Sequence, residues 1–582
     1  MNTWTLLSFI GFTALVAIIS YIATKKEDLK SSDGYFLGGR SLTGISIGFS
    51  ILLTNWSAEQ LIGLNGQGFS VGLSNMGWAV TSAIAFVLMA CVFLPMFIRK
   101  GITTIPDYIE DRFGPTARNV IAWCILVNMA AVALPSVVYA GALGLSKIFD
   151  VSSLFGISDS SALIISIIFI TIIGGFYAIF GGLKAVVVSD TVNGIGFFIG
   201  SILVLILALR ALGAGDAGDG LVELVTKEPQ MLNAVSSPKV NVPFGAIFTG
   251  MLLMNIYFAC TNQVIIQRAL GAKSLAEGQK GVLIAGIIKI ISIFILIVPG
   301  IAAYHLYGSE NIRPDEAYPL LINRLLPEAV VGFFGAVLFG AIISTFNSTI
   351  NSCSTIFAVN IYKPYHKGKM DPAKCITAGK WFGAGLALFA AICAPFIKFA
   401  PQGLYMFMQE FNALFTIPML LMILVGMVSK RASSTATISG MLTYMALYLF
   451  FRFGYTGWDL HFLHKTAIYF GCGLLVTAVI TYLHPAEIVK RRVQEAPVNI
   501  QNWKHLRLAS VATTVLMVAT YAVASPIGVV APIEEIPGNL MIILFASLFS
   551  TWAINTVIKR YCDNKANSIF ESGPKEELIK QV

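Results

Sequence analysis

The sequence predicts an all-α polytopic membrane protein with about 15 transmembrane helices, and three observations support this prediction. Only 12% of the 582 residues are charged, whereas a soluble domain carries about 25%. So little charge cannot cover the surface of a soluble core built from a chain of this length. Apolar runs of about 20 residues, long enough to cross a bilayer, recur along the whole sequence. A soluble enzyme is therefore excluded.

The predicted helices follow these apolar runs in chain order. The fifth run is interrupted by Gly174 and Gly175, and the longest connecting segments, 213–242 and 485–505, are too short for a soluble domain. The N-terminal run lacks the charged region and the cleavage site of a signal peptide, so we expect a retained helix. The fifteen expected spans are 4–24, 43–67, 71–98, 117–147, 161–181, 187–212, 243–268, 279–306, 328–362, 376–398, 403–429, 433–452, 464–484, 506–525 and 538–557.

Lys and Arg are distributed unevenly between the two sides of these spans. If the N-terminus lies outside, most of the 39 Lys and Arg residues fall inside, by roughly three to one. Cytoplasmic loops carry such an excess in membrane proteins. We therefore expect the N-terminus outside, the C-terminus inside and an odd number of spans. The net charge of +9 reflects this topology and does not indicate a nucleic-acid partner.

Motifs of nucleotide-driven pumps and of membrane-bound enzymes are absent from the sequence. It contains no GxxxxGK[ST] phosphate loop and no HExxH, GxSxG or CxxCH motif. We therefore expect neither enzyme activity nor a cofactor, and a secondary transporter or a channel remains.

Two spans contain polar interruptions that favour a transporter. The second span carries Thr54, Asn55, Ser57, Glu59 and Gln60 within seven residues, and the seventh is interrupted at 260–263 by Cys-Thr-Asn-Gln. Polar groups persist in hydrocarbon where they face a cavity or one another. The interruptions lie five spans apart, as expected for two inverted five-helix repeats that each begin with a discontinuous helix. The alternative is polar contact between packed helices, which explains one such cluster better than two.

Five segments in register then carry a family likeness. They are GYFLGGRSL at 34–42, NWSAEQLIG at 55–63, GITTIPD at 101–107, QVIIQR at 263–268 and IISTFNSTINS at 342–352. The chain resembles the solute:sodium symporters, and most closely the sodium/glucose cotransporter-like bacterial sodium/sugar branch. The resemblance implies a LeuT-type core of ten helices. We accordingly divide the chain into an N-terminal helix and cytoplasmic loop (1–42), a first inverted repeat (43–212), a second inverted repeat (243–430), and peripheral C-terminal helices with a cytoplasmic tail (431–582).

The resemblance also implies a sodium site. Ser344 and Thr345 match the family's hydroxyl ligands. Adjacent positions on one helix lie about 100° apart, so both hydroxyls can face the same side of it. Leu53, Trp56 and Ala341 match the carbonyl ligands. A small hard cation needs several such oxygens, although an isolated Ser-Thr pair more often bonds back to its own helix.

Asp190 matches an acidic residue on the family's sodium exit route. Its position near the inner end of the sixth span leaves a second interpretation open, in which it is an interfacial charge at the inner rim.

The implied substrate site combines amides, a hydroxyl and one cation. Gln and Asn amides suit sugar hydroxyls because each amide both donates and accepts, although packed helices satisfy them equally. Lys289 lies about 14 Å along its helix from Lys280, a depth that indicates function unless the side chain extends back to the interface. Phe258 and Trp78 match the positions of gating aromatic residues. The implied substrate contacts are Asn55, Gln60, Ser82, Asn255, Lys289 and Gln409.

One position departs from the family pattern. Where galactose-type members place a Glu against the sugar, this chain has Ala79. Loss of an acid beside a retained Lys289 makes the pocket more positive, so an anionic sugar such as a uronate becomes plausible.

We therefore expect a symporter of the cell inner (plasma) membrane that imports a monosaccharide, either a hexose or a sugar acid, with sodium by alternating access. Its expected partners are the small-molecule substrate, the sodium ion and the lipid bilayer, without an obligate protein partner. One alternative keeps the fold and changes the solute to a carboxylate, amino acid, vitamin or sialic acid. A transporter-like sensor or channel is the other, but neither a long signalling domain nor a recurring filter is visible.

Overall fold

A computed structural model of the chain describes residues 3–25, 38–235, 242–310, 312–366, 372–399, 404–455, 457–486 and 498–572. Every regular element within these ranges is helical, apart from two isolated backbone bridges, Leu42 with Ala272 and Ser274 with Asn499. Parts of the predicted loops at 25–42, 213–242 and 485–505, and the end of the predicted tail, lie outside the described residues. The all-α prediction therefore agrees with the described structure.

Twelve described helical segments are long and apolar enough to cross a membrane. Two shorter apolar helices, Gly44–Asn55 and Asp159–Gly175, accompany them. All fifteen predicted spans fall on helical segments, while the number of fifteen crossings stays a prediction. The twelve segments are Thr3–Ala23, Ala58–Arg99, Pro115–Ile148, Val186–Leu212, Ile293–Glu310, Glu328–Tyr365, Ala373–Ile397, Tyr405–Val428, Ser434–Gly454, Phe462–Leu483, Leu506–Val523 and Ile536–Arg560.

The central helix of the bundle is α20 (Glu328–Ile356), which is buried along most of its length. It packs against α1 (Thr3–Thr24), α10 (Leu134–Ile148), α12 (Asp159–Leu212) and α22 (Pro372–Cys393). Small residues let these helices approach closely: the Cα of Gly332 faces the backbone oxygen of Thr5 on α1.

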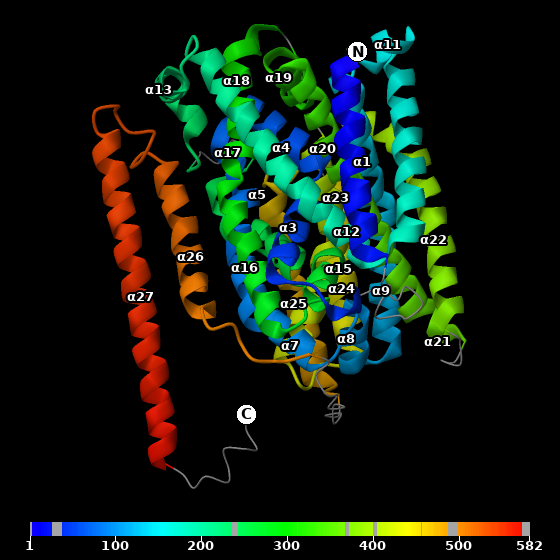
Figure 1. Cartoon of the computed structure of the whole chain (residues 1–582). Coiled ribbons are helices and arrows are strands. Elements are labelled where there is room, and N and C mark those ends of the chain that lie inside the picture. Colours follow the sequence, from blue (N-terminus) through cyan, green and yellow to red (C-terminus); the bar gives the residue numbers. More distant parts are fainter. Residues whose placement is uncertain are drawn as a thin grey trace.

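The helix α12 covers both the fifth and the sixth predicted spans. Gly174 packs against Phe346 of α20, and Asn193 packs against Gly340 of the same helix. In one straight helix, Gly174 and Asn193 would lie about 28 Å apart, yet their contacts on α20 are separated by only about 9 Å. The chain therefore changes direction between them, and Figure 1 shows the cyan and blue-green halves of α12 as separate rods. The two predicted spans correspond to these two halves.

The first polar interruption breaks a helix where the sequence predicts it. The helix α3 (Gly44–Asn55) ends at Trp56, whose φ and ψ of −83° and 55° are not helical, and α4 (Ala58–Val71) starts two residues later. The Trp56 N–H donates to the Leu52 carbonyl at 2.6 Å. The carbonyls that follow Leu52 consequently have no N–H partner within α3.

The second interruption separates α14 (Gly250–Cys260) from α15 (Gln263–Leu270). The Asn262 side chain accepts a hydrogen bond from the Val264 N–H at 2.9 Å and so caps the start of α15. Figure 1 places α3 and α15 near each other in the middle of the bundle, and the two helices are in contact.

The eighth predicted span, 279–306, is not one continuous helix. It consists of α16 (Leu275–Ile291), α17 (Ile293–Leu296) and α18 (Val298–Tyr307). Pro299 stands in the first turn of α18 and has no N–H to donate, and Ile297 leaves the helical conformation just before it. Proline thus explains this break, which the sequence analysis did not anticipate.

The connecting segment 213–242 contains the amphipathic helix α13 (Ala217–Lys227). The Asp216 side chain caps it by accepting from the N–H groups of Gly218 and Asp219 at 2.7 and 3.1 Å.

Five described helices form the C-terminal part of the chain: α23 (Leu404–Val428), α24 (Ser434–Leu449), α25 (Phe462–Leu483), α26 (Leu506–Val523) and α27 (Ile536–Ser572). Figure 1 shows α26 and α27 at one side of the bundle, and α27 continues past the predicted end of its span at residue 557. The remaining α-helices are α5 (Gly77–Val80), α6 (Ser82–Leu88), α7 (Leu94–Arg99), α8 (Ile105–Phe113), α9 (Pro115–Asn128), α11 (Val151–Phe155), α19 (Ala317–Leu325) and α21 (Lys363–Tyr365).

Candidate functional site

A cavity of about 150 Å³ lies where the two helix breaks meet. This is about ten times the volume that a single water molecule needs. Thr54 and Asn55 line it from the end of α3, and Asn262 and Val264 line it from the start of α15. Further lining residues come from α4, α14, α16, α20 and α23.

The structure brings together most of the predicted substrate and gate residues. Five of the six predicted contacts line the cavity, as do both gate residues; they are Asn55, Gln60, Asn255, Lys289, Gln409, Phe258 and Trp78. Ser82 is the exception. Its buried hydroxyl donates to the Ala79 carbonyl at 2.5 Å and is not part of the cavity wall, and the Asn255 amide instead reaches the neighbouring Thr81 hydroxyl at 2.8 Å.

Lys289 supplies the positive charge of the cavity. Its side chain is 2% exposed, its ammonium donates to the Asn55 Oδ1, and its Nζ lies 5.3 Å from the centre of the Phe258 ring. Within the described residues Lys289 forms no ion pair. The side chain therefore points into the cavity and does not extend to the membrane interface.

Glu59 supplies a negative charge to the same cavity. This residue of α4 is buried, and its Oε2 has no hydrogen-bond partner among the described residues. Ala79, where the sequence analysis inferred the loss of an acid, is fully buried and does not line the cavity. The lining thus contains one basic and one acidic side chain, and the preference for an anionic sugar inferred from Ala79 stays a prediction.

Several buried polar atoms around the cavity lack a partner among the described residues. They include the Trp78 Nε1, the Gln60 Oε1 and the Thr54 Oγ1, while the Gln60 amide donates to the Tyr405 hydroxyl at 3.3 Å. Buried polar groups are nearly always hydrogen-bonded. A concentration of unsatisfied donors and acceptors on one cavity therefore suits a ligand with many hydroxyl groups, or water in its place.

The predicted sodium ligands gather beside the break in α3. The Thr345 Oγ1 lies 3.3 Å from the Thr54 carbonyl oxygen and 3.1 Å from that of Ala341. The Ser344 hydroxyl is buried without a hydrogen-bond partner among the described residues. Leu53 and Trp56 lie in the same buried segment, where the last carbonyls of α3 have no N–H partner within that helix. This donor set of hydroxyls and carbonyls fits a small hard cation.

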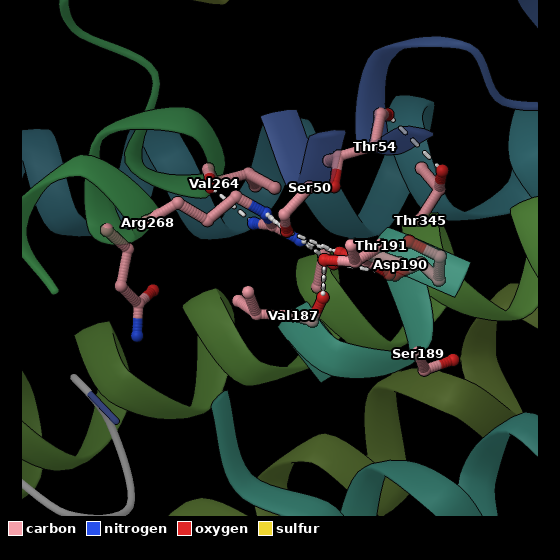
Figure 2. Close-up of polar contacts among 12 residues, drawn as sticks. Ser50, Thr54, Val187, Ser189, Asp190, Thr191, Val264, Arg268 and Thr345 are labelled. Atoms are coloured by element: carbon pink, nitrogen blue, oxygen red, sulfur yellow. Dashed lines mark hydrogen bonds and ion pairs between the residues drawn. The ribbon is translucent and has the colours of Figure 1, made fainter. Parts of the chain in front are cut away.

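Asp190 lies deep in the protein, opposite Arg268 (Figure 2). The Arg268 Nη2 is 3.3 Å from the Asp190 Oδ2, and the Ser50 hydroxyl donates to the same oxygen at 2.6 Å. Arg268 also donates to Ser50, to the Val264 carbonyl and to Ser348, whose own hydroxyl donates to the Ser344 carbonyl at 2.6 Å. Asp190 is therefore a fully buried charge, and its place on a sodium exit route stays a prediction.

The segment 101–107 connects two helices of the site. The Gln263 Oε1 accepts from the Ile105 N–H at 2.9 Å, and the Asn360 amide donates to the Asp107 carboxylate at 2.6 Å. Burial raises the pKa of Asp107, against the opposing effect of hydrogen bonds from Thr104 and Asn360. This motif therefore joins α8 to α15 and to the π-helical segment Phe357–Tyr362 that follows α20.

Several polar lining residues were not predicted from the sequence as part of the site. They include Glu59, Asn128, Tyr257, Asn262, Tyr405 and Asn412. A polar side chain inside an apolar span was a usable signal for Glu59, Asn128 and Asn412. Tyr405 gave no comparable signal, because tyrosine is also common at membrane interfaces.

The model of the sodium:solute symporter family matches residues 35–443, which is more than half of the chain. The chain belongs to the sodium:solute symporter family. The resemblance seen in the sequence is thereby confirmed, and the chain is a member of a family of membrane transporters.

Curated relatives agree with this family. An uncharacterised symporter of Escherichia coli (strain K12), YidK, is 40% identical, covering 90% of this chain and 91% of its own length. The sodium/glucose cotransporter of Vibrio parahaemolyticus is 33% identical, covering 77% of this chain and 86% of its own length. The human sodium/myo-inositol cotransporter is 27% identical, and the match covers 81% of this chain and 72% of the length of that protein.

A solved structure shows the fold of this symporter. The substrate-bound outward-open state of a Na⁺-coupled sialic acid symporter matches with a TM-score of 0.71, covering 84% of this chain and all of that chain. Its sequence is only 19% identical, so the likeness concerns the fold alone.

Proposed function

We propose that this symporter imports a monosaccharide, either a hexose or a sugar acid, together with sodium by alternating access. The observation that supports the proposal most is the cavity at the two helix breaks, lined by amides with unsatisfied polar atoms and lying beside the Ser344 and Thr345 hydroxyls. Relatives named for glucose and myo-inositol transport also carry ring substrates with many hydroxyl groups.

The substrate is held by groups that both donate and accept. The amides of Asn55, Gln60, Asn255 and Gln409 pair with ring hydroxyls, while Lys289 donates to an acceptor oxygen. Glu59 accepts from a hydroxyl on the same ring. Ser82 contributes only if the junction between α5 and α6 rearranges, because its hydroxyl now donates to the Ala79 carbonyl.

Sodium binds to the Ser344 and Thr345 hydroxyls and to the carbonyls of Leu53, Trp56 and Ala341. The carboxyl end of α3 carries a partial negative charge, which adds to the attraction. Sodium bound there holds the break in α3 in the shape that the substrate cavity requires, and this shared segment couples the two solutes.

Alternating access then moves the two solutes inward. Phe258 and Trp78 close over the substrate, and opening of the inner side exposes the site to the cytoplasm. Sodium leaves past Asp190, down its gradient, and the empty protein returns.

The topology belongs to the same proposal. Fifteen spans place the N-terminus outside and the C-terminus inside, and residues 43–212 and 243–430 form LeuT-type inverted repeats. Figure 1 supports an odd number of spans, because α1 begins at the end of the bundle opposite to that where α27 ends. We place the protein in the cell inner membrane, without an obligate protein partner.

Uptake into proteoliposomes tests the function. We expect a labelled neutral hexose or hexuronate to accumulate when sodium is high outside, and not when potassium replaces it. Accumulation of an amino acid or a vitamin in place of the whole sugar panel would overturn the substrate class. Sodium flux without substrate coupling would indicate a channel.

A further inference from the structure

An apolar groove of about 940 Å³ runs between α23 and α25, on the outside of the bundle and away from the substrate cavity. Leu424 and Val428 line it from α23, and Phe470 and Leu474 line it from α25. Val428 is 84% exposed. The volume lies near the upper end of the range of about 300–1,000 Å³ that is typical of small-molecule sites.

Two cations close one end of this groove. Lys430 and Arg431 follow α23 directly, line the groove and are exposed. Neither forms an ion pair with any described residue. Tyr482 lines the same end from the last turn of α25, and tyrosine is enriched where helices leave the membrane. The groove thus changes from apolar walls to positive charge over its length.

We propose that this groove binds one anionic phospholipid of the cytoplasmic leaflet, with its acyl chains against α23 and α25 and its phosphate at Lys430 and Arg431. Both helices are apolar enough to cross a membrane, so the groove walls face acyl chains. Basic residues between helices on the cytoplasmic side attract anionic headgroups.

A second copy of this chain fits the groove less well. A twofold interface would place the same patch opposite itself and bring Lys430 and Arg431 near the same two cations of the other copy. Such contacts between like charges are unfavourable, whereas a phosphate group neutralises the two cations. The assignment of the leaflet rests on the proposed topology, but binding itself does not.

Full-length protein in nanodiscs of phosphatidylcholine with a minor fraction of phosphatidylglycerol tests the proposal. Native mass spectrometry counts the retained lipids, and spin-labelled lipids give the relative affinity of each headgroup. We expect one tightly retained phosphatidylglycerol, and a roughly thirty-fold lower affinity in the double variant Lys430→Gln/Arg431→Gln. Both leaflets contain the anionic lipid, so the result does not depend on orientation or on transport.

Two further variants separate the contributions. Ala478→Trp fills the groove, keeps both cations and should also reduce retention. Lys559→Gln/Arg560→Gln removes two exposed cations from α27, away from the groove, and should leave retention unchanged. Equal retention of phosphatidylcholine and phosphatidylglycerol by the unmodified protein would overturn the proposal without any variant. A dimer that Ala478→Trp dissociates would assign the groove to a second copy instead.

Discussion

The Arg268 guanidinium lies 3.3 Å from the Asp190 carboxylate, and the two side chains are only 1% and 0% exposed. Arg268 belongs to α15, directly after the second helix break, and Asp190 belongs to α12. Ser50 of α3 and Ser348 of α20 complete the network. One ion pair therefore ties together the helices that surround the candidate sodium site.

Breaking this pair from one side should destabilise the protein strongly. Asp190→Asn or Arg268→Gln leaves one buried charge without compensation, at a cost of about 3–5 kcal/mol. The double variant removes both charges, so its loss of stability should be much smaller than the sum of the losses in the two single variants. Thermal unfolding of the purified protein measures this, with Glu310→Gln as a control, because the exposed Glu310–Arg324 pair should contribute little to stability. Additive losses at Asp190 and Arg268 would show that the two residues do not act as a pair.

Removing the hydroxyls at Ser344 and Thr345 should abolish sodium-driven accumulation. The double variant Ser344→Ala/Thr345→Ala deletes two of the proposed cation ligands while α20 keeps its backbone hydrogen bonds. Thr443→Ala is the matched control, because that hydroxyl donates within α24 at 2.8 Å. Uptake in proteoliposomes with and without a sodium gradient is the measurement. A double variant whose uptake still depends on sodium would place the site elsewhere.

The sequence predicted the helical fold because apolar windows report burial in lipid directly. It predicted the breaks in α3–α4 and α14–α15 as well, because Asn55, Ser57 and Asn262 compete locally for backbone hydrogen bonds. The break at Ile297 was missed, although Pro299 offered a signal. Composition alone does not show how α12 changes direction between two spans, since its apolar sequence suits one long helix or two.

The site was predicted less completely than the fold. The resemblance located residues by position in a motif, and five of the six predicted substrate residues line one cavity. Charge balance is different, because it depends on every side chain that faces the cavity. Glu59 faces the cavity and Ala79 does not, and a linear pattern cannot distinguish these orientations before the helices are packed.

The C-terminus should be cytoplasmic. The predicted inside segments contain most of the Lys and Arg residues, and the proposed number of spans is odd. A reporter that fluoresces only in the cytoplasm, fused after Val582, should therefore be bright. A second fusion in the segment between α26 and α27 should be dark, since one further helix separates the two points. An expressed but dark C-terminal fusion would remove one span from the proposed topology.

Lys289 and Glu59 should have opposite effects on substrate charge, because both line the same cavity. A charge-assisted hydrogen bond contributes about 1.5–3 kcal/mol. Lys289→Gln should therefore lower the affinity for a uronate by roughly one to two decades. For a neutral hexose, the substitution replaces one hydrogen-bond donor of the protein by another, so the affinity should fall by about one decade or less.

Glu59→Gln is the reciprocal variant, and it should shift the preference toward the uronate because it removes the repulsion between two carboxylates. Competition of unlabelled hexose and hexuronate against one labelled substrate measures both preferences in the same preparation. The Lys289→Gln/Glu59→Gln double variant restores charge balance and should return the preference toward that of the unmodified protein. Equal losses for both sugars in Lys289→Gln would mean that the ammonium holds Asn55 in position and does not contact the substrate, since Nζ already donates to the Asn55 Oδ1. The cavity would then be an ordinary site for neutral hexoses.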